Sequence, residues 1–155
     1  VHVRTHRNAK QGSDIKHYLT PLHAKLSIPY GIGVALVKGK VTLQDYTEEN
    51  IKDERISKIA RKVLVKVDDE IQKLYPDPRP MVVEIYDKQG NKFSSRVDYA
   101  KGDQKNPMTD EDLKTKFMDI TSTALPKQQA EKIFNAIKEV DKYDDIHNLT
   151  ELLRT

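Results

Sequence analysis

Three polar side chains lie close together at the start of a predicted helix. They are the ammonium of Lys25, the hydroxyl of Ser27 and the phenol of Tyr30. Ser27 is a typical helix N-cap, and Pro29 suits a first helical turn. Unpaired N–H groups at a helix N-terminus attract carboxylates, and a phenol can donate a hydrogen bond to a carboxylate or a developing oxyanion. The alternative is that Ser27 only caps the helix and Tyr30 packs with its hydroxyl at the surface.

Other reaction centres are not indicated by the remaining polar residues. The five histidines have no metal-binding spacing, and there is no cysteine for thiolate chemistry. Ser94 and Ser95 lack the glycines of a nucleophile elbow, and Gly31 and Gly33 lack the rest of a dinucleotide-binding motif. We therefore expect neither a metal site nor a nucleotide cofactor.

The helix that positions the polar group is expected from Ser27 to Gly39. Gly39 stands where a left-handed glycine commonly ends a helix. Nearly all residues between these ends are apolar or small, so we expect the helix to be buried on most sides. Gly31 and Gly33 each weaken a helix by about 1 kcal/mol relative to Ala. We therefore expect them to allow close packing against another backbone.

The rest of the first two thirds combines strands and helices. We expect a polar loop from Asn8 to Ser13, helical turns from Thr42 to Asp53 and a helix from Glu54 to Arg61 capped by Asp53. Alternating apolar residues predict strands, and Gly90 is placed for a left-handed hairpin residue. The expected strands span residues 1–7, 63–67, 81–86 and 92–99.

The last third is predicted to be entirely helical. Thr109 followed by acidic residues predicts a helix start. Leu113, Phe117 and Ile120 share one face of that helix, and Pro126 begins the next. Ala130, Ile133, Phe134 and Ile137 are expected to face inward, and a final helix is expected from Ile146 to Leu153.

The overall composition is that of a folded protein with a high charge content. Of the 155 residues, 37% are hydrophobic and 33% are charged, and the Lys and Glu bias is typical of hyperthermophile proteins. A net charge of +3 is too small to indicate nucleic-acid binding. The apolar stretch from Ile28 to Val37 is too short to span a membrane. The lack of cysteine and of a signal-peptide pattern at the start fits a cytoplasmic protein.

Two motifs resemble those of the MmgE/PrpD family, which includes 2-methylcitrate dehydratase and cis-aconitate decarboxylase. The segment Ala24–Tyr30, followed by Ala35–Gly39, resembles the family signature EAKFSLPY…VALL.G. Lys101–Asp103 and Asn106–Leu113 resemble the family motif KGDPxNPLSDEELxxKF. His23 and Leu26 depart from the signature, in which Glu and Phe are common at these positions.

The resemblance implies an α+β fold with a small antiparallel sheet packed with helices. In the family this lid domain is inserted into a large all-helical domain, and the active site lies between the two. Residues 1–108 correspond to the lid, and residues 109–155 correspond to helices that return to the helical domain. The implied reactions are dehydration, decarboxylation or epimerisation of small polycarboxylates, without a metal or organic cofactor.

The resemblance also implies roles for single residues. Tyr30 matches a tyrosine that lines the family's substrate pocket and is the catalytic candidate, while Lys25 and Ser27 are substrate-binding candidates. The other catalytic positions of the family have no counterpart here, so we expect this chain to be inactive alone. Its expected partners are the substrate and a missing N-terminal helical domain. Apolar helix faces left by that domain favour a homo-oligomer.

Two further interpretations remain open. The chain begins without Met in a strand-like pattern, which we take as a sign of a longer polypeptide, yet it could instead be a free-standing lid-like module. Such a module would bind an acidic ligand or a protein partner without catalysis. A nucleic-acid-binding domain is supported only by the basic residues of the first strand. We expect neither nucleic acid nor a membrane as a partner.

Overall fold

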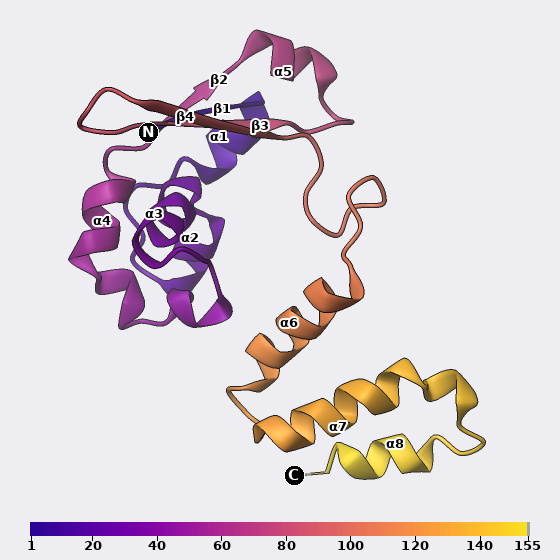
Figure 1. Ribbon diagram of the computed structural model, residues 1–155. Coiled ribbons are helices and arrows are strands. Elements are labelled where there is room, and N and C mark those ends of the chain that lie inside the picture. Colours follow the sequence, from indigo (N-terminus) through magenta and orange to yellow (C-terminus); the bar gives the residue numbers. More distant parts are fainter. Residues whose placement is uncertain (155) are drawn as a thin grey trace. The chain divides into compact units, whose positions relative to one another are not determined.

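The computed structural model describes residues 1–154, apart from the side chain of Asn148. The chain divides into two compact units, Val1–Asn106 and Pro107–Thr155, whose last residue lies outside the described part (Figure 1). The first unit combines a sheet with helices, and the second is helical. The predicted α+β class is therefore confirmed.

The first unit is built on a four-stranded sheet with the order β2-β1-β3-β4. Its strands are β1 (His2–Thr5), β2 (Leu64–Val67), β3 (Met81–Tyr86) and β4 (Lys92–Val97). The β1–β3 and β3–β4 pairs are antiparallel, but β1 and β2 are parallel. The sheet is thus mixed and not purely antiparallel as expected. A tight hairpin forces β3 and β4 to run in opposite directions, whereas the long helical crossover from β1 to β2 permits a parallel return.

One face of the sheet carries the apolar residues of alternating positions. Val3, Val63 and Val65 form a buried cluster on this face. Ile28 and Ile32, from the helix that begins within the signature, pack against it. The helix that is capped by Ser27 and carries Tyr30 is therefore fixed to the sheet by apolar side chains.

The helices of the first unit are α1 (Arg7–Ser13), α2 (Pro21–Leu26), α3 (Ile28–Lys38), α4 (Glu54–Ala60) and α5 (Asp69–Leu74). Two short 3₁₀ turns, η1 (Leu43–Tyr46) and η2 (Asn50–Lys52), connect α3 to α4 and confirm the predicted helical turns. Asp53 caps α4 as predicted.

Helix α3 has the predicted ends. Ser27 is its N-cap, and Gly39 follows it with a left-handed φ of 78°. A Cβ on Gly33 would lie 2.9 Å from the carbonyl oxygen of Ile56 in α4, so this glycine does permit the expected close approach. Gly31 does not, because a Cβ there would meet only the Tyr46 hydroxyl at 3.9 Å. The C-terminal half of α3 is also less buried than expected, since Leu36 is 42% exposed.

Three helices were not predicted. The segment expected as a loop forms α1, because the His6 side chain accepts a hydrogen bond from the Ala9 N–H and caps the helix. Thr20 caps α2 ahead of a proline, and Asp68 caps α5. Each of these helices has only six or seven residues, which is too short to show a clear hydrophobic period.

The second unit consists of α6 (Asp110–Thr121), α7 (Lys127–Lys138), the 3₁₀ turn η3 (Val140–Lys142) and α8 (His147–Leu152). Thr109 caps α6 through a reciprocal bond with Asp112, as the sequence predicts. The Phe117 and Phe134 rings lie 5.4 Å apart and join α6 to α7.

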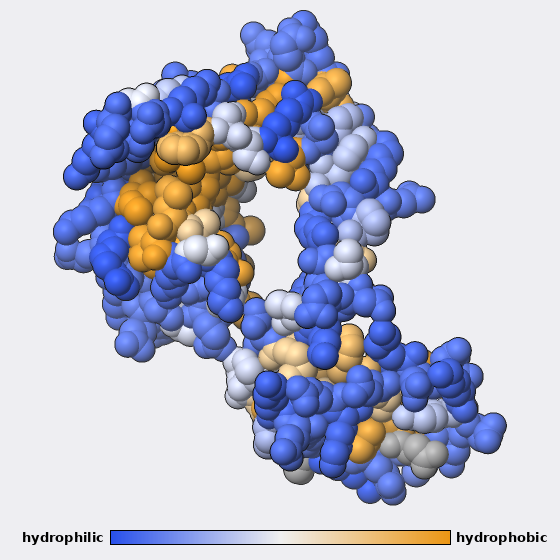
Figure 2. Space-filling view, in the orientation of Figure 1, coloured by the Kyte–Doolittle hydropathy of each residue, from blue (hydrophilic) through white to orange (hydrophobic). Residues whose placement is uncertain are grey.

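The apolar face of this helical unit is only partly covered. Ile137, expected to face inward, is 45% exposed. It lines a groove of about 420 Å³ together with Leu113, Phe117, Ile120 and Phe134. Figure 2 shows apolar surface over these two helices and beneath the sheet of the first unit. Within residues 1–154, no helix has both the length and the apolar character needed to cross a bilayer.

Candidate functional site

Ser27 links the two helices that carry the family signature. Its N–H donates to the Ala24 carbonyl oxygen at 3.1 Å and so ends α2. Its Oγ accepts a hydrogen bond from the Tyr30 N–H at 3.0 Å and so begins α3. The same hydroxyl donates to the carbonyl oxygen of Ile15. Ser27 is only 4% exposed, and its hydroxyl is fully used inside the protein.

Tyr30 lies in the interior beside Ser27. Its ring has no exposed surface and stands edge-on to Tyr18, with ring centroids 4.7 Å apart. Its hydroxyl donates to the backbone carbonyl oxygen of Asp45. Burial, followed by the neighbouring Tyr18 and Asp45, raises the pKa of Tyr30 to about 12. The phenol is therefore a neutral hydrogen-bond donor that holds the η1 turn against α3.

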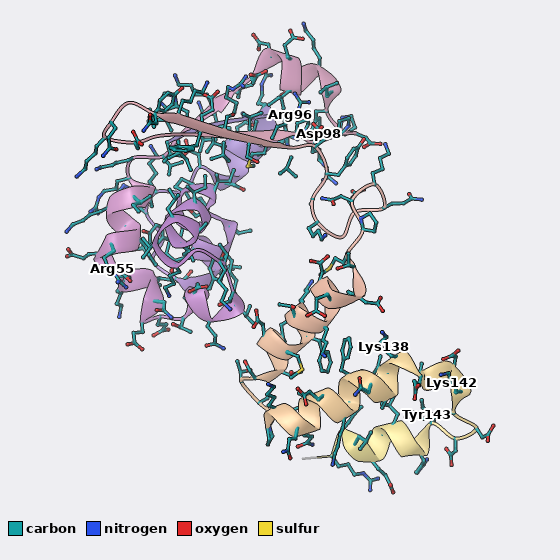
Figure 3. The ribbon with its side chains drawn as sticks, in the orientation of Figure 1. Arg55, Arg96, Asp98, Lys138, Lys142 and Tyr143 are labelled. Carbon is teal, nitrogen blue, oxygen red and sulfur yellow. The ribbon has the colours of Figure 1, made fainter. Side chains whose placement is uncertain are left out.

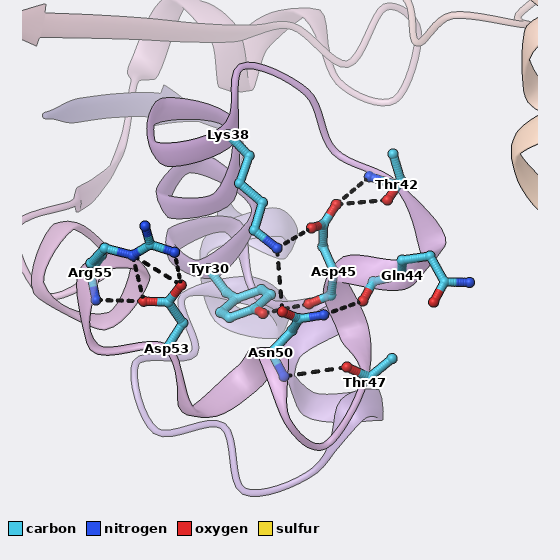
Figure 4. Close-up of polar contacts among 9 residues, drawn as sticks. All are labelled: Tyr30, Lys38, Thr42, Gln44, Asp45, Thr47, Asn50, Asp53 and Arg55. Carbon is cyan, nitrogen blue, oxygen red and sulfur yellow. Dashed lines mark hydrogen bonds and ion pairs between the residues drawn. The ribbon is translucent and has the colours of Figure 1, made fainter.

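Asp45, whose backbone carbonyl oxygen accepts the Tyr30 hydrogen bond, also carries a buried carboxylate in the η1 turn (Figure 4). Asp45 is 4% exposed, and its side chain accepts hydrogen bonds from Lys38 Nζ at 2.7 Å and from the N–H and hydroxyl of Thr42 at 2.7 and 2.8 Å. Burial alone would raise the Asp45 pKa, but these hydrogen bonds and the Lys38 charge lower it below its ordinary value. Asp45 is thus a paired anion that fastens the end of α3 to the following turn.

The N-terminal end of α3 is not the open anion site that the sequence suggested. Pro29 has no N–H, and the Tyr30 N–H is bonded to Ser27. At most the Ile28 N–H is left for a ligand carboxylate in the first turn. The expectation that unpaired N–H groups here attract a carboxylate and that the Tyr30 phenol donates to it is therefore not met, because both Tyr30 donors are bonded inside the chain. The physical reason is that the Ser27 side chain occupies the Tyr30 N–H and that Pro29 has no N–H to offer an anion.

Lys25 differs from the other two candidates because it is exposed. It lies in the last turn of α2, where a cation also interacts favourably with the helix dipole. Among the described residues it has no ion-pair partner. The structure thus places Ser27 and Tyr30 on one internal network and leaves Lys25 on the surface, two residues from the cap that fixes α2.

The network of Lys38, Thr42 and Asp45 was not predicted from the sequence. The available signal was the spacing of Thr42 and Asp45, which matches a capping box with Asp in place of Glu. Lys38 could not be assigned to Asp45 from the sequence, because the chain reverses direction at Gly39 between them. Over the described residues 1–154, no group of three His, Cys, Asp or Glu side chains could hold a metal ion.

Comparison with known proteins identifies the family of this chain. The family model of the MmgE/PrpD C-terminal domain matches residues 1–142. The chain belongs to the MmgE/PrpD family. This MmgE/PrpD chain is also similar to cis-aconitate decarboxylase of Mus musculus, with 23% identity over 137 residues. The match covers 84% of this chain but only 27% of that relative. The family membership inferred from the two sequence motifs is confirmed.

Proposed function

We propose that this chain is the lid-side, C-terminal part of an enzyme that acts on small polycarboxylates. The reaction is a dehydration, decarboxylation or epimerisation of the 2-methylcitrate dehydratase and cis-aconitate decarboxylase type. The supporting observation is the family match over residues 1–142, together with the similarity to cis-aconitate decarboxylase. Because the chain spans about a quarter of that relative, the activity belongs to a longer protein and the chain alone is inactive.

Lys25 is the residue that we assign to the substrate. An exposed ammonium is free to pair with a carboxylate of a polycarboxylate substrate, and a charge-assisted hydrogen bond of this kind contributes about 1.5–3 kcal/mol. Ser27 fixes the end of α2 two residues away and thereby positions Lys25. Tyr30 acts from the interior by holding α3 and η1 together. In this proposal Ser27 and Tyr30 do not contact the substrate, and both act as positioning residues.

The rest of the longer protein is the proposed partner of the second unit. The groove between α6 and α7 is lined by apolar side chains and flanked by Lys116 and by the ion pair of Asp110 and Lys138. An isolated domain gains stability by covering such a surface. In a protein the size of the mouse relative, the nearly three quarters that this chain does not match would be long enough to cover the groove.

Kinetics with cis-aconitate and 2-methylcitrate test the proposal. The longer protein should convert at least one of them, and the isolated chain should convert neither. In the longer protein, Lys25→Ala should raise KM by roughly 10- to 100-fold, as expected for the loss of one charge-assisted hydrogen bond. Lys40→Ala, which removes an exposed lysine beyond the other end of α3, is the matched control and should leave KM unchanged. Equal KM values for both variants would remove Lys25 from the site.

A free-standing binding module is the second candidate. It is supported by the internal hydrogen bonds of Ser27 and Tyr30, which leave neither hydroxyl open to a reacting group. Titration calorimetry separates the two functions. Saturable polycarboxylate binding by the isolated chain, with no turnover in any longer protein that contains it, would favour the module.

A further inference from the structure

Strand β4 forms an open edge of the sheet. It is the last strand in the order β2-β1-β3-β4, and it pairs only with β3 among the described residues. All six of its residues are exposed, including Phe93 at 58% and Val97 at 49%. A six-residue edge with exposed apolar side chains is a template for pairing with another strand.

The hairpin bonds show which backbone groups of β4 point outward. The Asp87 N–H donates to the Asn91 carbonyl oxygen at 3.1 Å, so this pair is hydrogen-bonded. Hydrogen-bonded and non-hydrogen-bonded pairs alternate along an antiparallel ladder. Phe93, Ser95 and Val97 therefore direct their N–H and C=O groups to β3, and Lys92, Ser94 and Arg96 direct theirs to the open side.

We propose that β4 pairs antiparallel with β4 of a second copy of this chain, about a two-fold axis at Ser95. In this register Phe93 lies opposite Val97 of the second copy. Lys92, which pairs with Glu84 of its own chain at 2.7 Å, lies opposite Asp98, which pairs with Arg96 of its own chain at 2.8 Å. Ser94 and Arg96 exchange the outward hydrogen bonds. An isologous two-fold interface requires a self-complementary surface, and this segment meets that requirement because it brings apolar side chains together and places no like charges directly opposite each other.

The two neighbouring registers are disfavoured by charge. Residues whose backbone groups point outward must lie opposite such residues of the second copy. This occurs only when the two-fold axis passes through a residue and not between two residues. The neighbouring registers are therefore centred on Ser94 or on Arg96. A centre at Ser94 places Lys92 opposite Arg96, and a centre at Arg96 places that guanidinium opposite its own copy. Like charges directly opposite destabilise a strand pair. Figure 3 shows Arg96 and Asp98 side by side at the end of β4, where they form an ion pair at 2.8 Å.

The proposed pairing also covers apolar surface of the sheet. Met81, Val83 and Val97 line a shallow pocket of about 300 Å³ on the same face as Phe93. A two-fold axis perpendicular to the sheet brings the Phe93 and Val97 side chains of the two copies together on this face. The Ser95 pair at the axis is small enough to allow this approach.

Disulfide trapping tests the register, because the chain contains no cysteine. A non-hydrogen-bonded pair has Cα atoms about 4.5 Å apart, within the range that a disulfide bridges. Ser95→Cys should therefore cross-link two copies under mild oxidation. Ser94→Cys is the control, because the two Ser94 Cα atoms would be more than about 7 Å apart, too far for a disulfide. At about 50 µM chain, a paired thiol at an effective concentration of about 1 mM should cross-link about 20-fold faster than the control.

Sedimentation of the unmodified chain and of Ser94→Pro provides the second measurement. The proline removes an outward N–H and leaves the bonds to β3 intact, as is tolerated on edge strands. The unmodified chain should dimerise with increasing concentration, and Ser94→Pro should stay monomeric with unchanged circular dichroism. A chain that is monomeric at about 100 µM, a dimer that survives Ser94→Pro, or equal cross-linking of the two cysteine variants would each overturn the proposal.

Discussion

Replacing Tyr30 with Phe removes one interior hydrogen bond and leaves the ring packing in place. The lost bond joins the phenol to the Asp45 carbonyl oxygen, and the ring keeps its contacts with Tyr18 and Tyr46. A net hydrogen bond contributes about 1 kcal/mol, and a buried acceptor left without a donor costs about 1–3 kcal/mol. We therefore expect the free energy of unfolding to fall by about 1–2 kcal/mol. For a unit of this size the melting temperature should fall by roughly 5–10 °C.

Urea denaturation and thermal melting of the full chain measure this loss. Tyr46→Phe is the matched control, because the Tyr46 hydroxyl has no hydrogen-bond partner among the described residues, and its effect should stay within about 0.5 kcal/mol. In the longer enzyme, Tyr30→Phe should leave kcat per folded molecule within about twofold, since a positioning role acts through stability. A large drop in kcat with unchanged stability would refute the positioning role and restore Tyr30 as the lid-side donor to the substrate.

The pH dependence of the same variant gives an independent check. The Tyr30 pKa is raised from 10.0 to about 12, so the folded state favours the neutral phenol. Its contribution to stability is complete below pH 10 and is lost as the pH rises from about 10 toward 12. The stability difference between the unmodified chain and Tyr30→Phe should therefore shrink across this window. A constant difference up to pH 12 would contradict the burial of the hydroxyl.

Three further substitutions test the packing around the site and the open helical face. Gly33→Ala should lower the free energy of unfolding by about 1–3 kcal/mol, because its Cβ would lie 2.9 Å from a backbone oxygen of α4. Gly31→Ala is the control and should not destabilise the chain. Equal melting temperatures of the two variants would contradict the close approach at Gly33. Lys38→Met should cost about 1–3 kcal/mol at pH 7 by removing the cation that pairs with buried Asp45. Because the Asp45 pKa is lowered in the folded state, the ionised carboxylate stabilises the fold above pH 4 and this stabilisation is lost at lower pH. The effect of Lys38→Met on the free energy of unfolding, measured by urea denaturation, should therefore diminish toward pH 3. Ile137→Asp should reduce the binding of an apolar fluorescent dye to the α6–α7 groove and change stability by less than about 1 kcal/mol, and undiminished dye binding would place the apolar surface elsewhere.

Local signals predicted the elements that depend on neighbouring residues. Ser27 and Gly39 bounded α3 correctly because capping uses atoms within one helical turn. Thr109 located the start of α6 for the same reason, and Gly90 located the hairpin with its φ of 86°. The short helices α1 and α5 were missed because their caps, His6 and Asp68, are not followed by a long apolar period.

Site geometry depended on contacts that the sequence does not encode locally. The sequence established which polar groups gather around the signature, and with the second motif it established the family. Whether Tyr30 faces a ligand or the interior was decided by Asp45, fifteen residues away, whose carbonyl oxygen accepts the phenolic hydrogen bond. The parallel pairing of β1 with β2 and the exposure of β4 were likewise decided by tertiary structure, because strand order follows from which faces can be buried together. Local capping chemistry is written in adjacent residues, but the choice between a buried and an open hydroxyl requires the packed neighbours of the fold.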